Sequence, residues 1–197
     1  MVATPQEQDP LKMTESDYLA FDEQSAVKHE FVNGDVYAMT GASWAHNVIC
    51  QNVGASLHGQ LRGKDCTVVA NDMRLKIASK AIYRYPDAMV ICGEPQFVDE
   101  RKDIINNPTV IIEVLSPSTA LIDRNEKLDE YTEIPSLKAY LLVAQDDAKI
   151  ESYQRNQSGI WTYAKTSSLE HQIELTSINC LLALADVYET VRFPDKK

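Results

Sequence analysis

The sequence predicts a single α/β domain in which a mixed β-sheet is flanked by helices. Strand-like segments alternate with helical ones, and a strand, a helix and a strand follow one another over 109–144. Such a crossover places its two strands parallel, with the helix covering one face of the sheet. The 197 residues are 44% hydrophobic and 24% charged, which is ordinary for one globular domain. Residues 1–12 are polar and predict a flexible tail before a domain over 13–197.

Capping and turn signals predict the first elements of this domain. Residues 14–17 resemble a capping box and predict a short helix that begins there. Two strand-like segments, 29–32 and 35–39, flank Asn33-Gly34. Because this dipeptide favours the tight turns that join antiparallel strands, the segment is expected to be a hairpin.

A long helix is predicted over 43–61, where apolar residues recur three or four positions apart. Ser43 suits its N-cap and Gly63 its C-terminal end. Further strands are expected at 67–70, 73–77, 88–91, 109–115 and 138–144. The remaining segments predict a polar loop over 93–108, a helix over 120–132, a hairpin of 149–154 with 160–165, and a short helix over 181–187.

The formal charge of the chain is -10, from 29 acidic and 19 basic residues. This balance argues against an extended phosphate-binding surface, because neutralising a duplex backbone usually takes a basic face. No apolar run approaches the roughly 20 residues that a membrane span requires. The first residues lack the features of a signal peptide, so a cytoplasmic location without membrane contact is expected.

The four cysteines are far apart in the sequence and form no C-x-x-C pair. They are Cys50, Cys66, Cys92 and Cys180. Each is flanked by small or apolar residues, and we interpret them as buried free thiols rather than a disulfide framework or a zinc site.

Two carboxylates are expected to lie within the sheet. The segment 110–115 is apolar on both faces apart from Glu113, and Asp87 precedes the apolar segment 88–91. Either residue alone is more simply interpreted as a strand-end acid facing water. Two neighbouring buried carboxylates, however, would repel each other unless a divalent cation lay between them, and oxygen ligands suit Mg²⁺ or Mn²⁺.

The helix over 120–132 provides a cation. Asp123, Lys127 and Tyr131 recur at four-residue spacing and therefore share one face of this helix. If that face packs on the sheet, Lys127 reaches the carboxylates. Spacing alone favours the simpler interpretation of an exposed Asp123–Lys127 ion pair.

These motifs resemble a known family. The pattern combines Pro86-Asp87, the segment 113–119, the Asp123/Lys127/Tyr131 series and the segment 137–143. It is similar to the family described as putative restriction endonucleases, formerly a domain of unknown function, which resembles the PD-(D/E)XK nuclease superfamily. The resemblance covers about 13–190. It implies a restriction-endonuclease-like core. Leu115 stands where the motif of the superfamily has a lysine. In the family that this chain resembles, that lysine lies on the following helix, and the matching residue here is Lys127.

The resemblance implies a Mg²⁺- or Mn²⁺-dependent endonuclease that cuts DNA. Asp87, Glu113 and the carbonyl of Val114 would bind the metal, and Lys127 would orient the attacking water. Glu30 would complete the site or bind a second metal; an exposed hairpin residue is the equally weighted alternative.

His46, Arg74 and Tyr131 are further candidates for contacts with substrate. His46 is as readily explained by packing on its own helix, and Arg74 by an ion pair. Superfamily members commonly act as dimers, so a homodimer is compatible with the sequence. The absence of a Gly-rich phosphate loop argues against a nucleotide cofactor. A catalytically inactive nuclease-like fold that binds nucleic acid or protein, and a hydrolase of smaller phosphoesters, remain the alternatives.

Overall fold

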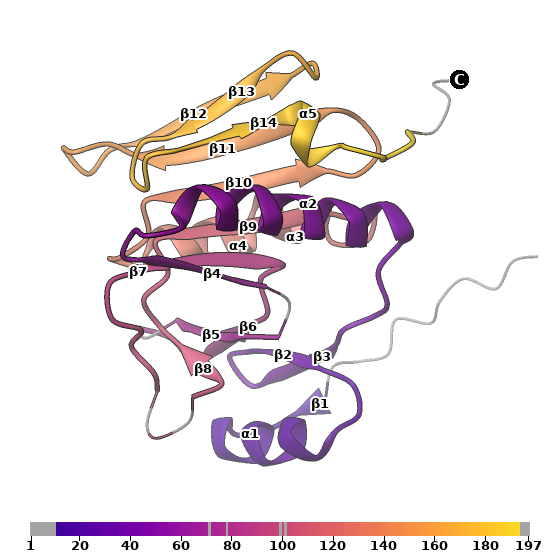
Figure 1. The fold of residues 1–197 in the computed structure, drawn as a ribbon. Helices are drawn as coiled ribbons and strands as arrows, with labels where there is room; N and C mark the ends of the chain where they lie inside the picture. The colour runs from indigo at the N-terminus through magenta and orange to yellow at the C-terminus, as the bar shows by residue number, and fades with distance from the viewer. Residues whose placement is uncertain (1–10, 71, 78, 99, 101, 194–197) are drawn as a thin grey trace, which may run out of the picture.

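The computed structural model describes residues 11–193 apart from 71, 78, 99 and 101 (Figure 1). Most of the predicted tail, 1–10, lies outside the described residues. Two six-stranded sheets and one two-stranded sheet form the described part, with helices between and beside them. The predicted mixed α/β class is therefore confirmed. No helix in the described part of the chain is long and apolar enough to cross a membrane.

The first sheet lies at the N-terminal end of the molecule, beside α1 (Glu15–Gln24) (Figure 1). Its strands, in spatial order, are β1 (Leu11–Lys12), β3 (Asp35–Ala38), β2 (His29–Val32), β6 (Ile82–Arg84), β5 (Arg74–Ile77) and β8 (Ile104–Ile105). The Thr14 hydroxyl accepts a hydrogen bond from the Asp17 amide at the start of α1, as the capping signal predicts. Asn33 and Gly34 both adopt positive φ angles, of 52° and 103°, and the predicted hairpin is confirmed.

The second sheet forms the centre of the molecule. Its strands, in spatial order, are β12 (Trp161–Ser167), β11 (Lys149–Arg155), β10 (Ala139–Ala144), β9 (Val110–Leu115), β7 (Ala88–Cys92) and β4 (Cys66–Ala70). β9 and β10 are parallel, as the crossover predicts, and the other neighbours are antiparallel. Every residue of β9 and β10 is buried, so these two strands occupy the middle of the core.

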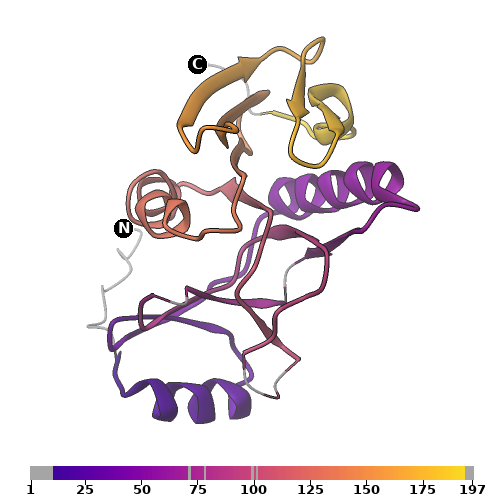
Figure 2. The ribbon, with the colours of Figure 1, turned by 90° about the vertical axis from the view of Figure 1, so that its left-hand side faces the viewer.

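Helices cover both faces of the central sheet (Figure 2). α2 (Trp44–Leu61) packs on the face that carries Val110, Ile112 and Val114. The opposite face of β9 packs against α4 (Glu126–Thr132) and its Tyr131. This two-sided burial explains why β9 is apolar at every position except one.

Several predicted boundaries are wrong, mainly where pairing partners lie far apart in the sequence. Leu11–Lys12 pairs with β3 instead of belonging to a tail, and β8 lies inside the predicted polar loop. The predicted helix over 120–132 is broken at Asn125 into α3 (Ala120–Arg124) and α4, because Asn125 leaves the helical conformation with φ -118° and ψ -80°.

The C-terminal part also differs from the prediction. β13 (Gln172–Leu175) pairs with β14 (Cys180–Ala183), and only 184–187 form the helix α5 (Leu184–Val187). Burial alternates along β14, but a run this short cannot reveal a two-residue period from sequence alone.

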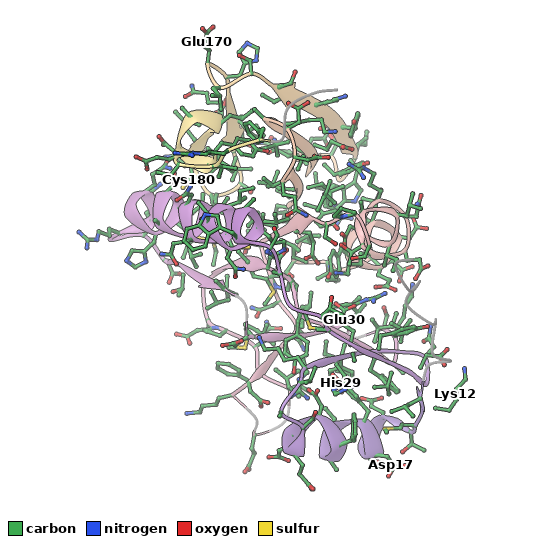
Figure 3. All side chains as sticks on the ribbon, turned by 90° about the vertical axis from the view of Figure 1, so that its right-hand side faces the viewer. Lys12, Asp17, His29, Glu30, Glu170 and Cys180 are labelled. Atoms are coloured by element: carbon green, nitrogen blue, oxygen red, sulfur yellow. A yellow bond between two sulfur atoms is a disulfide. The ribbon has the colours of Figure 1, made fainter. Side chains whose placement is uncertain are left out.

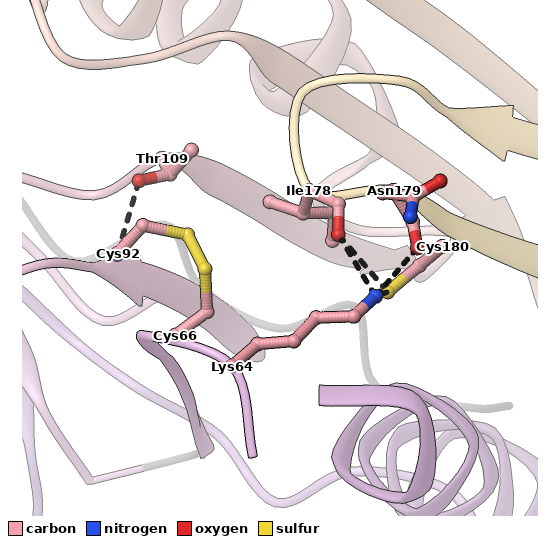
Figure 4. The surroundings of a disulfide bond; sticks show 7 residues. All are labelled: Lys64, Cys66, Cys92, Thr109, Ile178, Asn179 and Cys180. Atoms are coloured by element: carbon pink, nitrogen blue, oxygen red, sulfur yellow. Dashed lines mark hydrogen bonds between the residues drawn. A yellow bond between two sulfur atoms is a disulfide. The ribbon is translucent and has the colours of Figure 1, made fainter. Parts of the chain in front are cut away.

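The prediction of four free thiols is wrong for two of them. Cys66 and Cys92 form a disulfide between the neighbouring antiparallel strands β4 and β7 (Figure 4). They are 26 residues apart, so only the pairing of the strands brings them together. Cys50 and Cys180 are buried and free, as predicted.

Candidate functional site

A cavity of about 690 Å³ opens where the two large sheets, the N-terminal end of α2 and the α3–α4 segment meet. The start of α2 contributes His46 to its lining. The charged side chains that line it come from the two sheets, the residue before β7 and the α3–α4 segment, and they are Glu30, Arg84, Asp87, Glu113, Asp123, Glu126 and Lys127. Glu30 lies on the side of β2 toward the centre of the molecule, whereas its neighbour His29 lies nearer α1 (Figure 3). The alternation of side chains along β2 therefore directs Glu30 into the cavity.

Glu113 is deeply enclosed, with 3% of its surface exposed. Its Oε1 accepts hydrogen bonds from Lys127 Nζ and from the Tyr131 hydroxyl, both at 2.9 Å. The net pKa of Glu113 is raised to about 8, and burial is the largest cause. The Lys127 ammonium lowers this pKa, while nearby carboxylates, first Asp87, raise it. A buried carboxyl group such as that of Glu113 is stabilised when it is protonated or when its charge is paired with a cation.

Asp87 immediately precedes β7 and lies opposite Glu113, because its neighbour Ala88 pairs with Ile112 on β9. Its Oδ2 accepts a hydrogen bond of 2.7 Å from the amide of Val114. The Asp87 amide in turn lies 3.4 Å from Glu113 Oε2. The antiparallel pairing of β7 with β9 thus holds the two carboxylates side by side.

Lys127 is buried, contrary to the exposed ion pair that spacing alone favours. Its Nζ lies 2.9 Å from Glu113, 3.1 Å from Asp123 and 3.4 Å from Glu30. Burial lowers the pKa of Lys127, but the three carboxylates together raise it by a larger amount. The net pKa is therefore well above its ordinary value. The packing of α4 on the sheet brings Lys127 within reach of three acids, and their charges keep it protonated.

Arg84 and Glu130 belong to the same network, although neither was a sequence candidate. The Arg84 guanidinium donates two hydrogen bonds to Glu130, at 2.9 and 2.7 Å, and a third of 2.7 Å to Glu30. Burial raises the pKa of Glu30, but the charges of Lys127 and Arg84 together lower it by a larger amount. The net pKa of Glu30 is therefore below its ordinary value. Glu30 is therefore an enclosed, paired carboxylate and not the exposed hairpin residue of the alternative interpretation.

The remaining sequence candidates lie at different distances from this centre. His46 Nε2 is 3.2 Å from Asp87 Oδ2, so His46 contacts a carboxylate. Tyr131 is fully buried, and its hydroxyl donates a hydrogen bond to Glu113. Tyr131 is therefore inaccessible to a substrate. Arg74 is not brought to this cavity: it lines a separate one beside α1, where it pairs with Asp22 at 3.2 Å and donates to the Tyr85 hydroxyl at 2.8 Å.

The charges of the network suit a divalent cation. Five carboxylates (Glu30, Asp87, Glu113, Asp123 and Glu130) surround two basic side chains (Arg84 and Lys127), an excess of three negative charges if all are ionised. Protonation of one carboxyl removes only part of this excess. Carboxylate oxygens directed into an open cavity are ligands that Mg²⁺ and Mn²⁺ prefer.

The fold is that of the nuclease-like α/β class. A crystal structure from Anabaena variabilis, described as "a putative nuclease belonging to DUF820", matches 91% of this chain and 99% of its own chain with a TM-score of 0.75. The two sequences are 13% identical, so this match establishes the shared fold.

The family is established by sequence. The family model Uma2, described as "Putative restriction endonuclease", matches residues 15–185, and the chain belongs to this family. Two proteins of Synechocystis are also similar along most of their lengths. The uncharacterized protein sll1609 is 36% identical over 164 residues, or 83% of this chain and 93% of that protein. The uncharacterized protein slr1290 is 33% identical over 184 residues, or 92% of this chain and 94% of that protein.

Proposed function

We propose that this protein is a Mg²⁺- or Mn²⁺-dependent endonuclease that hydrolyses phosphodiester bonds in DNA. The observation that carries the proposal is the pair formed by Asp87, immediately before β7, and the buried Glu113 on the neighbouring strand β9. The charged Lys127 lies 2.9 Å from Glu113. Membership of the family described as "Putative restriction endonuclease" and the nuclease-like fold support the same reaction class.

Asp87, Glu113 and the carbonyl of Val114 would hold the cation. The two carboxylates supply the hard oxygen donors that these ions prefer, and Val114 lies beside them, bound through its amide to Asp87. When bound, the ion supplies Lewis-acid stabilisation of charge on the phosphate and makes water a better nucleophile at neutral pH. The carboxylates of the protein thereby exchange a bound proton for a metal ion.

Lys127 would position the reacting groups. Its pKa is raised, so it stays protonated and acts as a hydrogen-bond donor to the attacking water or to a phosphate oxygen rather than as a base. Tyr131 and Glu30 restrain Lys127 and Glu113 from either side. Arg84 and Glu130 fix Glu30 in turn, which makes them positioning residues.

A second candidate function is a catalytically inactive nuclease-like protein that binds nucleic acid or another protein. Two observations favour it. The chain has a net charge of -10, and both basic residues of the cavity, Arg84 and Lys127, are already paired with carboxylates. Binding of a long duplex would therefore receive little electrostatic support from the cavity itself.

Plasmid cleavage with Mg²⁺ or Mn²⁺ tests the first proposal. The wild-type protein should cut, and Asp87→Asn, Glu113→Gln and Lys127→Met should each lose at least about a hundredfold in rate, as removal of one electrostatic contact to a transition state does. Glu133→Gln is the matched control, because Glu133 is an exposed carboxylate that pairs with Lys80. Equal cleavage by the Asp87 and Glu113 variants would show that the activity is not from this site.

Calorimetric titration with Mn²⁺ separates the two candidates. Binding that is abolished in Asp87→Asn and Glu113→Gln supports the metal-dependent enzyme. Absence of binding at millimolar Mn²⁺ would contradict it and favour the inactive, binding protein.

A further inference from the structure

Two side chains beside Asp87 differ chemically from the carboxylates of the proposed magnesium site. His46 and Cys50 are four residues apart on α2 and so lie on the same face of that helix. One potential ligand atom each from His46, Cys50 and Asp87 can be chosen within 4.8 Å of one another. Helix and strand come together here, since α2 packs on the central sheet and Asp87 precedes β7.

We propose that His46, Cys50 and Asp87 form a binding site for Zn²⁺ or a similar thiophilic divalent cation. An imidazole nitrogen, a thiolate sulfur and a carboxylate oxygen are the three ligand types of zinc sites in proteins. Mg²⁺ has little affinity for sulfur and prefers oxygen alone. The donor set therefore selects a different ion from the one that suits Asp87 and Glu113.

A tetrahedral zinc ion sets the separation of its ligand atoms. Zn–S bonds of about 2.3 Å and Zn–N and Zn–O bonds of about 2.0–2.2 Å place neighbouring ligand atoms roughly 3.3–3.6 Å apart. His46 Nδ1 lies 3.5 Å from Cys50 Sγ, and His46 Nε2 lies 3.2 Å from Asp87 Oδ2. These two contacts use different ring nitrogens, and only one nitrogen would bind the ion. With one atom taken from each residue, the three ligand atoms lie within 4.8 Å of one another, so they would move closer together on binding.

The fourth position of the ion would face the cavity. His46 and Asp87 both line the cavity of about 690 Å³, and Cys50 lies behind them with 5% of its surface exposed. A site with three protein ligands and one open position retains a water molecule or takes a ligand from solution.

A bound ion would act on the negative charges near the Cys50 thiol, which lies close to the carboxylates of Asp87 and Glu113. A cation between these groups offsets both carboxylates and deprotonates a coordinating thiol. Binding would therefore release the thiol proton to solvent and form the metal–sulfur bond in its place.

Asp87 is common to this site and to the proposed magnesium site. The two ions would therefore compete, and Zn²⁺ would inhibit cleavage by withdrawing Asp87 from the catalytic cation. This consequence rests on the proposed function, whereas the zinc site itself does not.

Cobalt provides a direct test, because Co²⁺ occupies zinc sites and reports a thiolate ligand by its charge-transfer absorption in the near ultraviolet. Titration of the metal-free protein with Co²⁺, without thiol reductants, should produce this band, and Zn²⁺ should abolish it. Cys50→Ser should lose the band, and His46→Gln should weaken the affinity for Zn²⁺ at least about tenfold. Cys180→Ser is the matched control, since Cys180 is the other buried free thiol in the described part of the chain.

The outcomes are separable. Absence of the band in the wild-type protein, or its persistence in folded Cys50→Ser, would overturn the zinc site. If Cys50→Ser does not fold, an unchanged Zn²⁺ affinity in His46→Gln would overturn it instead. Displacement of Co²⁺ by excess Mg²⁺ supports the shared Asp87, and simultaneous binding of both ions contradicts it. A cobalt band in a protein that does not cleave DNA would refute the proposed function alone.

Discussion

The buried carboxyl of Glu113 should make the stability of the metal-free protein depend on pH. The pKa of Glu113 is about 8 in the folded protein, against an ordinary value of 4.5 for an exposed glutamate. Between these values the folded state holds a proton that the unfolded state has lost. The free energy of unfolding is therefore highest below the unfolded pKa and falls as the pH rises toward 8.

The size of this effect follows from proton linkage. Each pH unit inside the window costs about 1.4 kcal/mol, so stability should fall by roughly 2.5 kcal/mol between about pH 5.5 and 7.5. Glu113→Gln cannot release a proton, and its side-chain oxygen can still accept from Tyr131. The difference in unfolding free energy between wild type and variant should therefore change by about the same amount over this range.

Urea denaturation in the presence of a chelator measures this difference. Glu133→Gln, at an exposed carboxylate, should follow the wild-type curve. Addition of Mn²⁺ near pH 7.5 should restore the stability of the wild type but not of Glu113→Gln, because the ion binds the folded state in place of the proton. A difference that does not vary with pH would show that Lys127 alone keeps Glu113 ionised, and would refute the reasoning.

Three further changes test the network and the covalent link. Lys127→Met should destabilise the protein by roughly 3–5 kcal/mol at neutral pH, since three carboxylates lose their shared cation; a loss below about 1 kcal/mol in chemical denaturation would contradict the buried pairing. Arg84→Met should cost a similar amount, about 3–5 kcal/mol, and Arg84→Met combined with Glu130→Met should recover part of it in a double-mutant cycle; strict additivity would argue against coupling. Replacement of both Cys66 and Cys92 by serine should lower the unfolding free energy by about 3 kcal/mol through loop entropy, and unchanged thermal unfolding would show that the disulfide adds no stability.

Local sequence patterns predicted the elements that are stabilised locally. The hairpin at Asn33-Gly34 follows from positive φ angles that few other residues adopt, and α2 follows from its apolar spacing and the Ser43 cap. Strands as short as β6 and β8 have no such signal. They exist because partners far away in the sequence pair with them, and the Cys66–Cys92 disulfide depends on the same kind of long-range pairing.

For the candidate site, the sequence by itself determined which residue types stand at Asp87, Glu113 and Lys127, and that Glu113 belongs to a strand apolar on both faces. Only the tertiary structure decided which neighbours share the site. The tertiary structure buries Lys127 and brings Arg84 and Cys50 next to the carboxylates of the site. It places Arg74 in a different cavity. The physical reason is that spacing specifies which side chains share a face of one helix or strand. Which face becomes buried, and against what, depends on packing between elements distant in the chain.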